Sequence, residues 1–208
     1  MDASDEGLCA LGWLTVESAR GFEARAPTDR PFFQPGSMDP MLARALVTIA
    51  GARPGATVVD PMCGTGGLLI EAGLVGARVL GCDAQHEMVR GTRLNLQHTL
   101  DGAATPQRGE DGSLGVCRAD ARRLPLREGS ADAVVFDAPY GRQSKIEAGT
   151  LAALVGDALA EARRVAPRAV IVADRSWEDA AEAAGWTVDA RFERRVHRSL
   201  VRHVHVLV

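Results

Sequence analysis

Two hydrophobic patterns alternate along the 208-residue chain. Short apolar runs, typical of buried strands, are separated by longer stretches in which apolar residues recur every three or four positions, as they do on one face of a helix. The short runs predict strands at residues 57–60, 78–82, 114–117, 133–136, 169–173, 187–192 and 201–208. The longer stretches predict helices at residues 39–50, 67–75, 85–100, 150–165 and 177–184.

Strands that alternate with helices predict a doubly wound α/β fold around a seven-stranded, mostly parallel sheet. The last two predicted strands have no helix between them, so we expect an antiparallel C-terminal hairpin. Residues 1–38 show weak periodicity, and we divide the chain into an N-terminal segment (1–38) and one domain (39–208). That segment ends in a stretch where Phe32 and Phe33 stand between prolines, which excludes a helix interior. The stretch either plugs the edge of the core or covers a ligand.

The first predicted strand runs into Asp60 and then into a loop that contains Gly64, Gly66 and Gly67. Glycine permits a positive φ angle and lets the backbone approach a ligand closely, and the free N–H groups of the next helix face the same place. The loop therefore predicts a nucleotide-type site, although a glycine turn without a ligand is the alternative. Leu69 breaks the dinucleotide fingerprint Gly-x-Gly-x-x-Gly/Ala. The pattern Asp-x-x-x-Gly-x-Gly fits S-adenosylmethionine-dependent methyltransferases better.

Two further acids follow predicted strands and suit a nucleoside. Asp83 ends the second strand about 20 residues beyond the glycine loop, where a carboxylate accepts hydrogen bonds from both ribose hydroxyls. Asp120 follows the third strand and could accept the adenine amine, while the N–H next to it, at Ala121, donates to a ring nitrogen. A helix-capping acid and a solvated loop acid are the respective alternatives.

The most informative stretch is Asp137-Ala138-Pro139-Tyr140-Gly141-Arg142, directly after the predicted central strand. In open α/β sheets the ligand crevice lies at the carboxyl ends of the strands. An exocyclic amine on a base is a poor nucleophile, and two acceptors for its hydrogens, the Asp137 carboxylate and the Ala138 carbonyl, would localise its lone pair toward a methyl donor. Tyr140, the only tyrosine of the chain, is expected to stack on the base.

Composition narrows the possibilities only a little. The net charge of −3 neither predicts nor excludes a nucleic-acid partner, so any basic surface must be local. Phosphate contact and plain solvation are equally open for the basic residues near predicted carboxyl ends of strands or in the terminal hairpin, which are Arg142, Lys145, Arg175, Arg194, Arg195, Arg198 and Arg202. The four cysteines have no zinc-type spacing and no metal site is expected. Without a membrane span or a signal peptide in the sequence, we expect a cytoplasmic protein.

Four motifs resemble the archaeal type of the tRNA (guanine-10-N2)-methyltransferases. They are Arg30-Pro31-Phe32-Phe33-Gln34-Pro35-Gly36-Ser37-Met38-Asp39-Pro40, the glycine loop after Asp60, the loop after Asp137, and His197-Arg198-Ser199-Leu200-Val201-Arg202. The resemblance implies a Rossmann-like class I methyltransferase fold and transfer of one or two methyl groups from S-adenosylmethionine to N2 of a tRNA guanine. It implies that Asp137, Ala138, Pro139 and Tyr140 form the catalytic loop. The family's first proline in that loop is replaced by Ala138, which keeps the carbonyl but loses rigidity.

The resemblance and the motifs together give a set of cofactor contacts, namely Phe33, Pro35, Ser37, Asp60, Cys63, Gly64, Thr65, Gly66, Asp83, Ala84, Asp120, Ala121 and Asp137. The resemblance also implies a tRNA partner, a THUMP-type RNA-binding domain that is missing here or separate, and a small zinc-binding activator subunit that could pair with the third strand. Three rivals stay open: methylation of another amine (DNA adenine, rRNA guanine or protein glutamine), a cofactor-binding scaffold without turnover, and a nicotinamide oxidoreductase.

Overall fold

The computed structural model describes residues 21–101, 115–140, 148–198 and 200–208. Their strands form one seven-stranded sheet in the order β3-β2-β1-β4-β5-β7-β6. The five strands from β3 to β5 in this order run parallel, and β7 pairs antiparallel with both β5 and β6. The strand bounds are β1 Thr57–Asp60, β2 Arg78–Asp83, β3 Val116–Arg118, β4 Ala133–Asp137, β5 Ala169–Ala173, β6 Val188–His197 and β7 Leu200–Leu207. The predicted mixed sheet with its C-terminal hairpin is confirmed.

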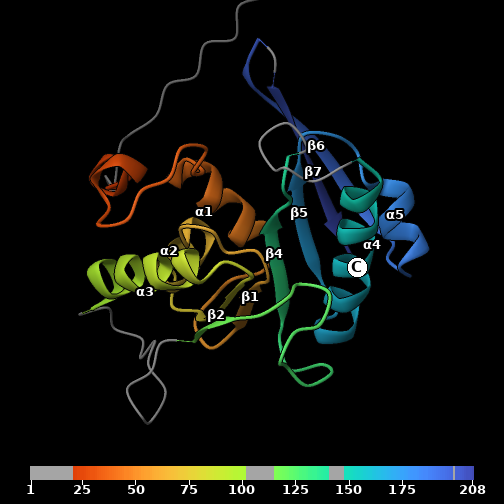
Figure 1. Cartoon of the computed structure of the whole chain (residues 1–208), viewed down its shortest axis with the longest axis horizontal. Coiled ribbons are helices and arrows are strands. Elements are labelled where there is room, and N and C mark those ends of the chain that lie inside the picture. Colours follow the sequence, from red (N-terminus) through yellow and green to blue (C-terminus); the bar gives the residue numbers. More distant parts are fainter. Residues whose placement is uncertain (1–20, 102–114, 141–147, 199) are drawn as a thin grey trace, which may run out of the picture.

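Helices cover both faces of the sheet, α1 to α3 on one and α4 and α5 on the other (Figure 1). Each layer buries its own apolar cluster against the sheet, and the side chains of β4 contribute alternately to the two clusters. The helix bounds are α1 Pro40–Ile49, α2 Gly67–Leu74, α3 His86–Leu100, α4 Ala148–Val165 and α5 Glu178–Ala183, and the short 3₁₀ turns η1 Glu23–Arg25 and η2 Pro27–Asp29 precede them. Among these helices of the described residues, none combines the length and apolarity needed to cross a bilayer.

Local sequence explains where the helices nearest the site begin. Asp39 caps α1, because its carboxylate accepts hydrogen bonds from the N–H groups of Met41 (3.0 Å) and Leu42 (3.1 Å). Pro40 at the first helical position lacks the N–H that would need a partner there. Gly66 precedes α2 in the left-handed conformation with φ of 82°, which suits glycine and few other residues.

The hairpin differs most from the sequence prediction. β6 was expected at residues 187–192 but runs from Val188 to His197, five residues further. Its outer half is rich in arginine and resembles a polar loop in sequence, yet its backbone groups pair with β7. The other bounds agree with the predictions or differ by at most two residues, as expected for helix and strand ends. The beginning of the predicted third strand, at residue 114, lies outside the described residues.

Candidate active site

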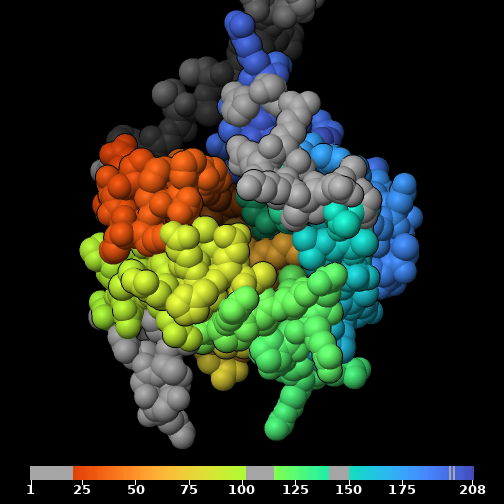
Figure 2. All heavy atoms as spheres, in the orientation of Figure 1, coloured from red at the N-terminus to blue at the C-terminus, as the bar shows by residue number. Residues whose placement is uncertain are grey.

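Two cavities lie side by side at the carboxyl ends of β1, β2 and β4. The first, of about 210 Å³, is lined by residues 34–38 of the N-terminal segment, by the glycine loop and by Asp60, Met62, Leu68, Met88 and Asp137. The second, of about 270 Å³, is lined by Pro61, Met62, Asp83, Ala84, Gln85, Asp120, Ala121, Asp137, Pro139 and Leu154. Met62 and Asp137 line both, so the two cavities meet at Asp137. Figure 2 shows this part of the surface hollowed between the orange N-terminal segment and the cyan start of α4.

The glycine loop has the tight backbone that its sequence predicts. Gly64 and Gly66 have positive φ angles of 51° and 82°. The Thr92 hydroxyl of α3 donates to the Gly64 carbonyl at 2.6 Å. A Cβ on Gly66 would lie 2.9 Å from the Thr92 methyl group, so a side chain there would push α3 away. Gly66 therefore shapes the loop without lining either cavity, whereas Cys63, Gly64 and Thr65 line the first.

Asp83 connects the glycine loop to the end of β2. Its carboxylate accepts hydrogen bonds from the N–H groups of Gly64 (3.0 Å) and Gln85 (2.9 Å). With Ala84 it lines the second cavity, on the side where the sequence predicts a ribose. The N-cap of α3 is Gln85, and at this helix Asp83 accepts only the N–H of that residue, so Asp83 does not cap the first turn of the helix itself.

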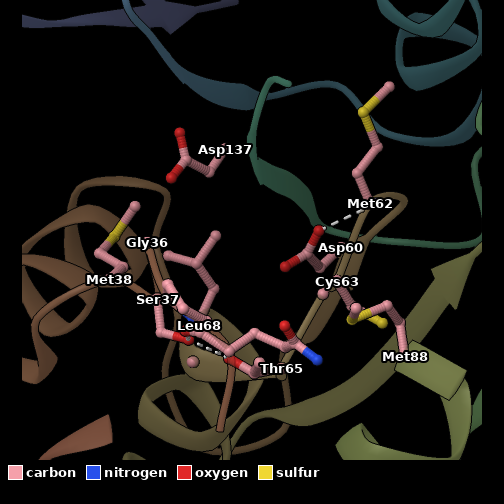
Figure 3. A pocket seen from close by; sticks show the side chains of 14 residues that line it. Gly36, Ser37, Met38, Asp60, Met62, Cys63, Thr65, Leu68, Met88 and Asp137 are labelled. Atoms are coloured by element: carbon pink, nitrogen blue, oxygen red, sulfur yellow. Dashed lines mark hydrogen bonds between the residues drawn. The ribbon is translucent and has the colours of Figure 1, made fainter. Parts of the chain in front are cut away.

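Asp60 lies at the bottom of the first cavity and is 2% exposed (Figure 3). The Met62 N–H donates to its carboxylate at 3.1 Å. Burial raises the pKa of Asp60 well above its usual value, and the nearby charges of Asp83 and Asp137 add to the rise, while the Met62 hydrogen bond opposes it. Its position at the first cavity therefore favours the neutral form of this carboxyl group.

The N-terminal segment is held over the first cavity by Asn95 of α3, a residue that the sequence analysis did not select. The fully buried Asn95 amide accepts from the Phe32 N–H (2.9 Å) and donates to the carbonyls of Phe32 (2.8 Å) and Thr65 (2.9 Å). Ser37 adds a hydroxyl contact of 3.1 Å to Thr65 (Figure 3). The sequence feature that could have identified Asn95 is its position as a polar residue on the buried face of a predicted helix.

Two of the three residues selected from this segment line the first cavity. Pro35 and Ser37 do so, and Figure 3 shows Gly36, Ser37 and Met38 across the cavity from Asp60. Phe33 is 44% exposed and is absent from the described residues that line either cavity. Its neighbour Phe32 packs against α3 at Gly91 instead. The segment thus packs against α3 and also forms one wall of the first cavity.

Asp120 and Ala121 line the second cavity, in agreement with their position after the third predicted strand. The Asp120 carboxylate also receives a two-pronged ion pair from Arg122, with a closest distance of 2.7 Å. Hydrogen bonds from Arg122 lower the pKa of Asp120, so the carboxylate is charged. A ligand amine at Asp120 would therefore share this carboxylate with Arg122.

Three side chains from two distant parts of the chain meet at Asp137. The Tyr140 hydroxyl donates to the Asp137 carboxylate at 2.8 Å. Arg202 of β7 donates from Nε to the Tyr140 hydroxyl oxygen at 3.0 Å, and its Nη2 lies 3.7 Å from the second Asp137 oxygen. Arg202 is thus a neighbour of the candidate catalytic acid rather than a surface arginine. Its side chain is only 8% exposed.

The surroundings of Asp137 tune its proton affinity. Burial at the junction of the cavities raises the pKa of Asp137 to about 6, with a smaller rise from Asp174. The positive charge of Arg202 and the hydrogen bond from Tyr140 act in the opposite direction. Burial and the adjacent Asp137 charge raise the pKa of Tyr140, so its phenol keeps the proton. Asp137 is therefore mostly ionised at neutral pH.

The remaining loop residues take different positions. Ala138 is buried, and its N–H donates to the Val172 carbonyl of β5 at 2.8 Å, which fixes the backbone directly after Asp137. Pro139 lines the second cavity. Among the other basic candidates, Arg175 pairs with its neighbour Asp174, and Arg142 and Lys145 lie outside the described residues. In the described ranges, no three His, Cys, Asp or Glu side chains gather as a metal site would require.

An α/β sheet of this order, with a glycine loop after β1 and an acid as the last residue of β1, β2 and β4, is typical of the Rossmann-like class I methyltransferases. The chain belongs to the UPF0020 family, described as RMKL-like, methyltransferase domain, whose match covers residues 27–204.

Individual proteins that are similar to the chain are consistent with this family. The chain is 38% identical over 198 residues to the tRNA (guanine(10)-N2)-dimethyltransferase of Methanothermobacter thermautotrophicus, and the match covers 93% of the chain and 56% of that relative. TrmN from Thermus thermophilus is similar in structure, with a TM-score of 0.65 and 26% identity over 83% of this chain and 49% of that one. Magnesium protoporphyrin IX methyltransferase from Synechocystis, solved with bound SAM, shares the fold at 14% identity, with a TM-score of 0.59 and coverage of 80% and 76%. The chain spans about half the length of the curated relatives it matches.

Proposed function

We propose that the chain transfers methyl groups from S-adenosylmethionine to the exocyclic N2 amine of a tRNA guanine, at position 10. One observation carries the proposal: Asp137, an acceptor suited to an amine, lies where the two cavities meet. The name of the archaeal relative supplies the substrate, and the shared family supplies the reaction class.

The residues present fit this cofactor. The joined cavities fall within the range of about 300–1,000 Å³ that small-molecule sites occupy. The second cavity would hold the nucleoside, with Asp83 facing the ribose and Ala84, Asp120 and Ala121 around the base. The first would hold the methionine part between Pro35, Ser37 and the glycine loop, close to the free N–H groups of α2. We propose residues 1–38 as the segment that includes this cover, and residues 39–208 as the catalytic domain.

When bound, the cofactor supplies an electrophilic methyl group on a sulfonium. The Asp137 carboxylate accepts one hydrogen of the incoming amine, and the Ala138 carbonyl accepts the other, which directs the lone pair of the amine. The hydrogen bond from Ala138 to Val172 holds that carbonyl in place. Tyr140 fixes Asp137 through its hydroxyl and offers its ring as a stacking surface for the base. Holding the nucleophile in line supplies much of the rate.

The partners belong to the same proposal. We propose that a THUMP-type domain contributes to tRNA binding, as the resemblance of the motifs implies. We place a small zinc-binding activator subunit at the edge strand β3. Arg93 of α3 already donates to the Val116 carbonyl of this strand, at 2.5 and 3.2 Å, so a partner that pairs with β3 must displace Arg93.

Asp137→Asn tests the catalytic role. The amide keeps the size of the side chain but loses the negative acceptor, and we expect methyl transfer to fall about 100- to 1,000-fold, as it does when one such preorganised group is removed. Binding of S-adenosylhomocysteine, measured by calorimetry, should persist. Asp189→Asn, an exposed acid on β6, is the matched control and should keep full activity.

The substrate is tested separately. Mass spectrometry of nucleosides after reaction with a tRNA transcript should show N2-methylguanosine or its dimethyl form, and a transcript with adenosine at position 10 should stay unmodified. Methylation of that second transcript, or of DNA adenine or a protein glutamine alone, would refute the specific substrate. Cofactor binding without methyl transfer to any acceptor would indicate a scaffold.

A further inference from the structure

The β6–β7 hairpin combines a concentrated positive charge with an exposed aromatic residue. Between residues 191 and 202 it has five arginines and one glutamate, whereas the whole chain has a net charge of −3. Phe192 is 51% exposed in the middle of β6. The last pair between β5 and β7 is Ala173 with His203, so the hairpin beyond it extends past the sheet (Figure 1, dark blue).

Strand register assigns these residues to faces. Asp137 pairs with Val172, Val172 with Val204, and Val204 with Phe192. Residues paired in this way point to the same side of a sheet, so Phe192 and Asp137 share a face at the same level. Three strand spacings of about 4.8 Å separate them, or roughly 14 Å, which a few nucleotides of RNA can span.

Arg194 lies one step further out on this face. It pairs directly with Arg202, whose guanidinium contacts Tyr140 and Asp137. The two arginines are therefore side by side, the inner one turned to the candidate site and the outer one exposed. Among the described residues Arg194 has no acidic partner.

The opposite face of the hairpin has a different character. Arg191 pairs there with Glu178 of the α5 side, and Glu193 lies 3.4 Å from the His203 ring. Arg195 is exposed on that face, because it pairs with Val201 and alternates with Arg194. Of these two successive exposed arginines, Arg194 thus lies on the face of the sheet that carries Asp137, and Arg195 lies on the opposite face.

We propose that the face carrying Phe192 and Arg194 is the RNA-binding surface of this chain, which holds the strand that flanks the target base. Phe192 stacks on an unpaired base and Arg194 contacts a phosphate. Proteins that bind single-stranded nucleic acids combine these two kinds of contact. The inference rests on the proposed function, because it assumes that an RNA base is delivered to Asp137.

Binding is measured by fluorescence anisotropy of a labelled tRNA transcript with the full chain and S-adenosylhomocysteine. At 50 mM salt we expect Arg194→Gln to weaken binding about tenfold and to reduce the salt slope by about one, as the loss of one phosphate contact does. Phe192→Ala should weaken binding about tenfold with the salt slope unchanged. Arg195→Gln, the same change on the opposite face, is the matched control and should stay within about twofold.

Equal weakening by Arg194→Gln and Arg195→Gln would overturn the proposal, since it would show a diffuse charge effect. Unchanged binding in Phe192→Ala would do the same. If Phe192→Ala proves unstable in thermal unfolding, Phe192→Leu keeps the apolar area but removes the ring, and it should still weaken binding. These readouts need no methyl transfer. A chain that is inactive or differently specific, but whose RNA binding is weakened in these variants, would refute the proposed function and still show that this face binds RNA.

Discussion

Asp137 shows how a single residue becomes suited to a reaction through what surrounds it. Its recessed position disfavours the charged form, while Arg202 and Tyr140 favour it, and the balance is a pKa of about 6. Without the arginine and the phenol, burial alone would leave more of this acid protonated at neutral pH. In the proposed reaction Arg202 would therefore be a positioning residue, because it contacts Asp137 and Tyr140.

The pH dependence of methyl transfer follows from this pKa. A protonated Asp137 cannot accept an amine hydrogen, so kcat/KM should rise with pH and level off above an apparent pKa of about 6. Arg202→Met removes the charge that lowers the pKa of Asp137, so the rising limb should move to higher pH. Initial rates with radiolabelled cofactor between about pH 5 and 9, with controls for buffer effects, measure the rising limb for the unaltered chain and for the variant.

Arg202→Lys is the matched control. Because lysine keeps the positive charge, the rising limb of this variant should stay close to the pH at which it lies in the unaltered chain. A uniform fall in rate at every pH, with the limb unmoved and KM for tRNA raised, would show that Arg202 acts as a phosphate contact instead. That was the alternative offered by the sequence, and the pH profile separates the two roles.

At the scale of elements, α3 holds the site together. Thr92 and Asn95 lie one turn apart on its buried face and bond the carbonyls of Gly64 and Thr65. Asn95 also fixes the backbone of Phe32, and Gly91 makes room for the Phe32 ring. One face of a helix therefore sets the glycine loop and the cover of the first cavity relative to each other.

Gly91→Ala should loosen this cover. The new Cβ would lie 1.9 Å from Phe32 Cδ1, and the ring cannot turn away freely because Asn95 holds its backbone. Overpacking of this kind lowers the free energy of unfolding by about 1–3 kcal/mol. The affinity for S-adenosylhomocysteine should also fall, by about tenfold for each 1.4 kcal/mol of binding free energy that the displaced cover no longer contributes. Urea unfolding and calorimetry measure the two effects.

Gly156→Ala in α4 provides the comparison. A Cβ at Gly156 meets nothing within 4 Å, so the same substitution should stabilise the chain by about 0.5–1 kcal/mol through helix propensity and leave cofactor binding unchanged. Equal effects of the two substitutions on binding would contradict the role assigned to the contact between Phe32 and Gly91.

Across the whole molecule, the sequence predicted what depends on local pattern. The strands β1 and β5 have the bounds expected from their apolar runs, and Asp137 and Asp60 lie at one cavity because parallel strands bring their carboxyl ends to one edge. Asn95 and Arg202 were not assigned to the site, because their partners are 63 and 62 residues away in the chain and no spacing encodes such contacts. The length of β6 was missed for a related reason, since its outer half is strand only because β7 pairs with it.

A buried acid joins the N-terminal segment to the rest of the molecule. Glu71 of α2 is fully buried, and Arg25 reaches it from the segment at 2.8 Å while Arg44 reaches it from α1 at 2.7 Å. Three parts of the chain therefore meet at one carboxylate. Removing one charge of such a cluster leaves the remaining charges without that ion-pair partner in a partly buried environment.

Glu71→Gln tests how much this junction stabilises the whole molecule. Loss of a fully buried partner costs about 3–5 kcal/mol, and because Arg25 and Arg44 are partly exposed we expect a smaller loss of about 2–3 kcal/mol. For a chain of this size that corresponds to a fall in Tm of roughly 4–12 °C. Arg191→Gln breaks the exposed pair with Glu178 and should cost less than about 1 kcal/mol. If both variants unfold at the same temperature, Glu71 does not hold the segment, and the cover of the first cavity depends on Asn95 and Phe32 alone.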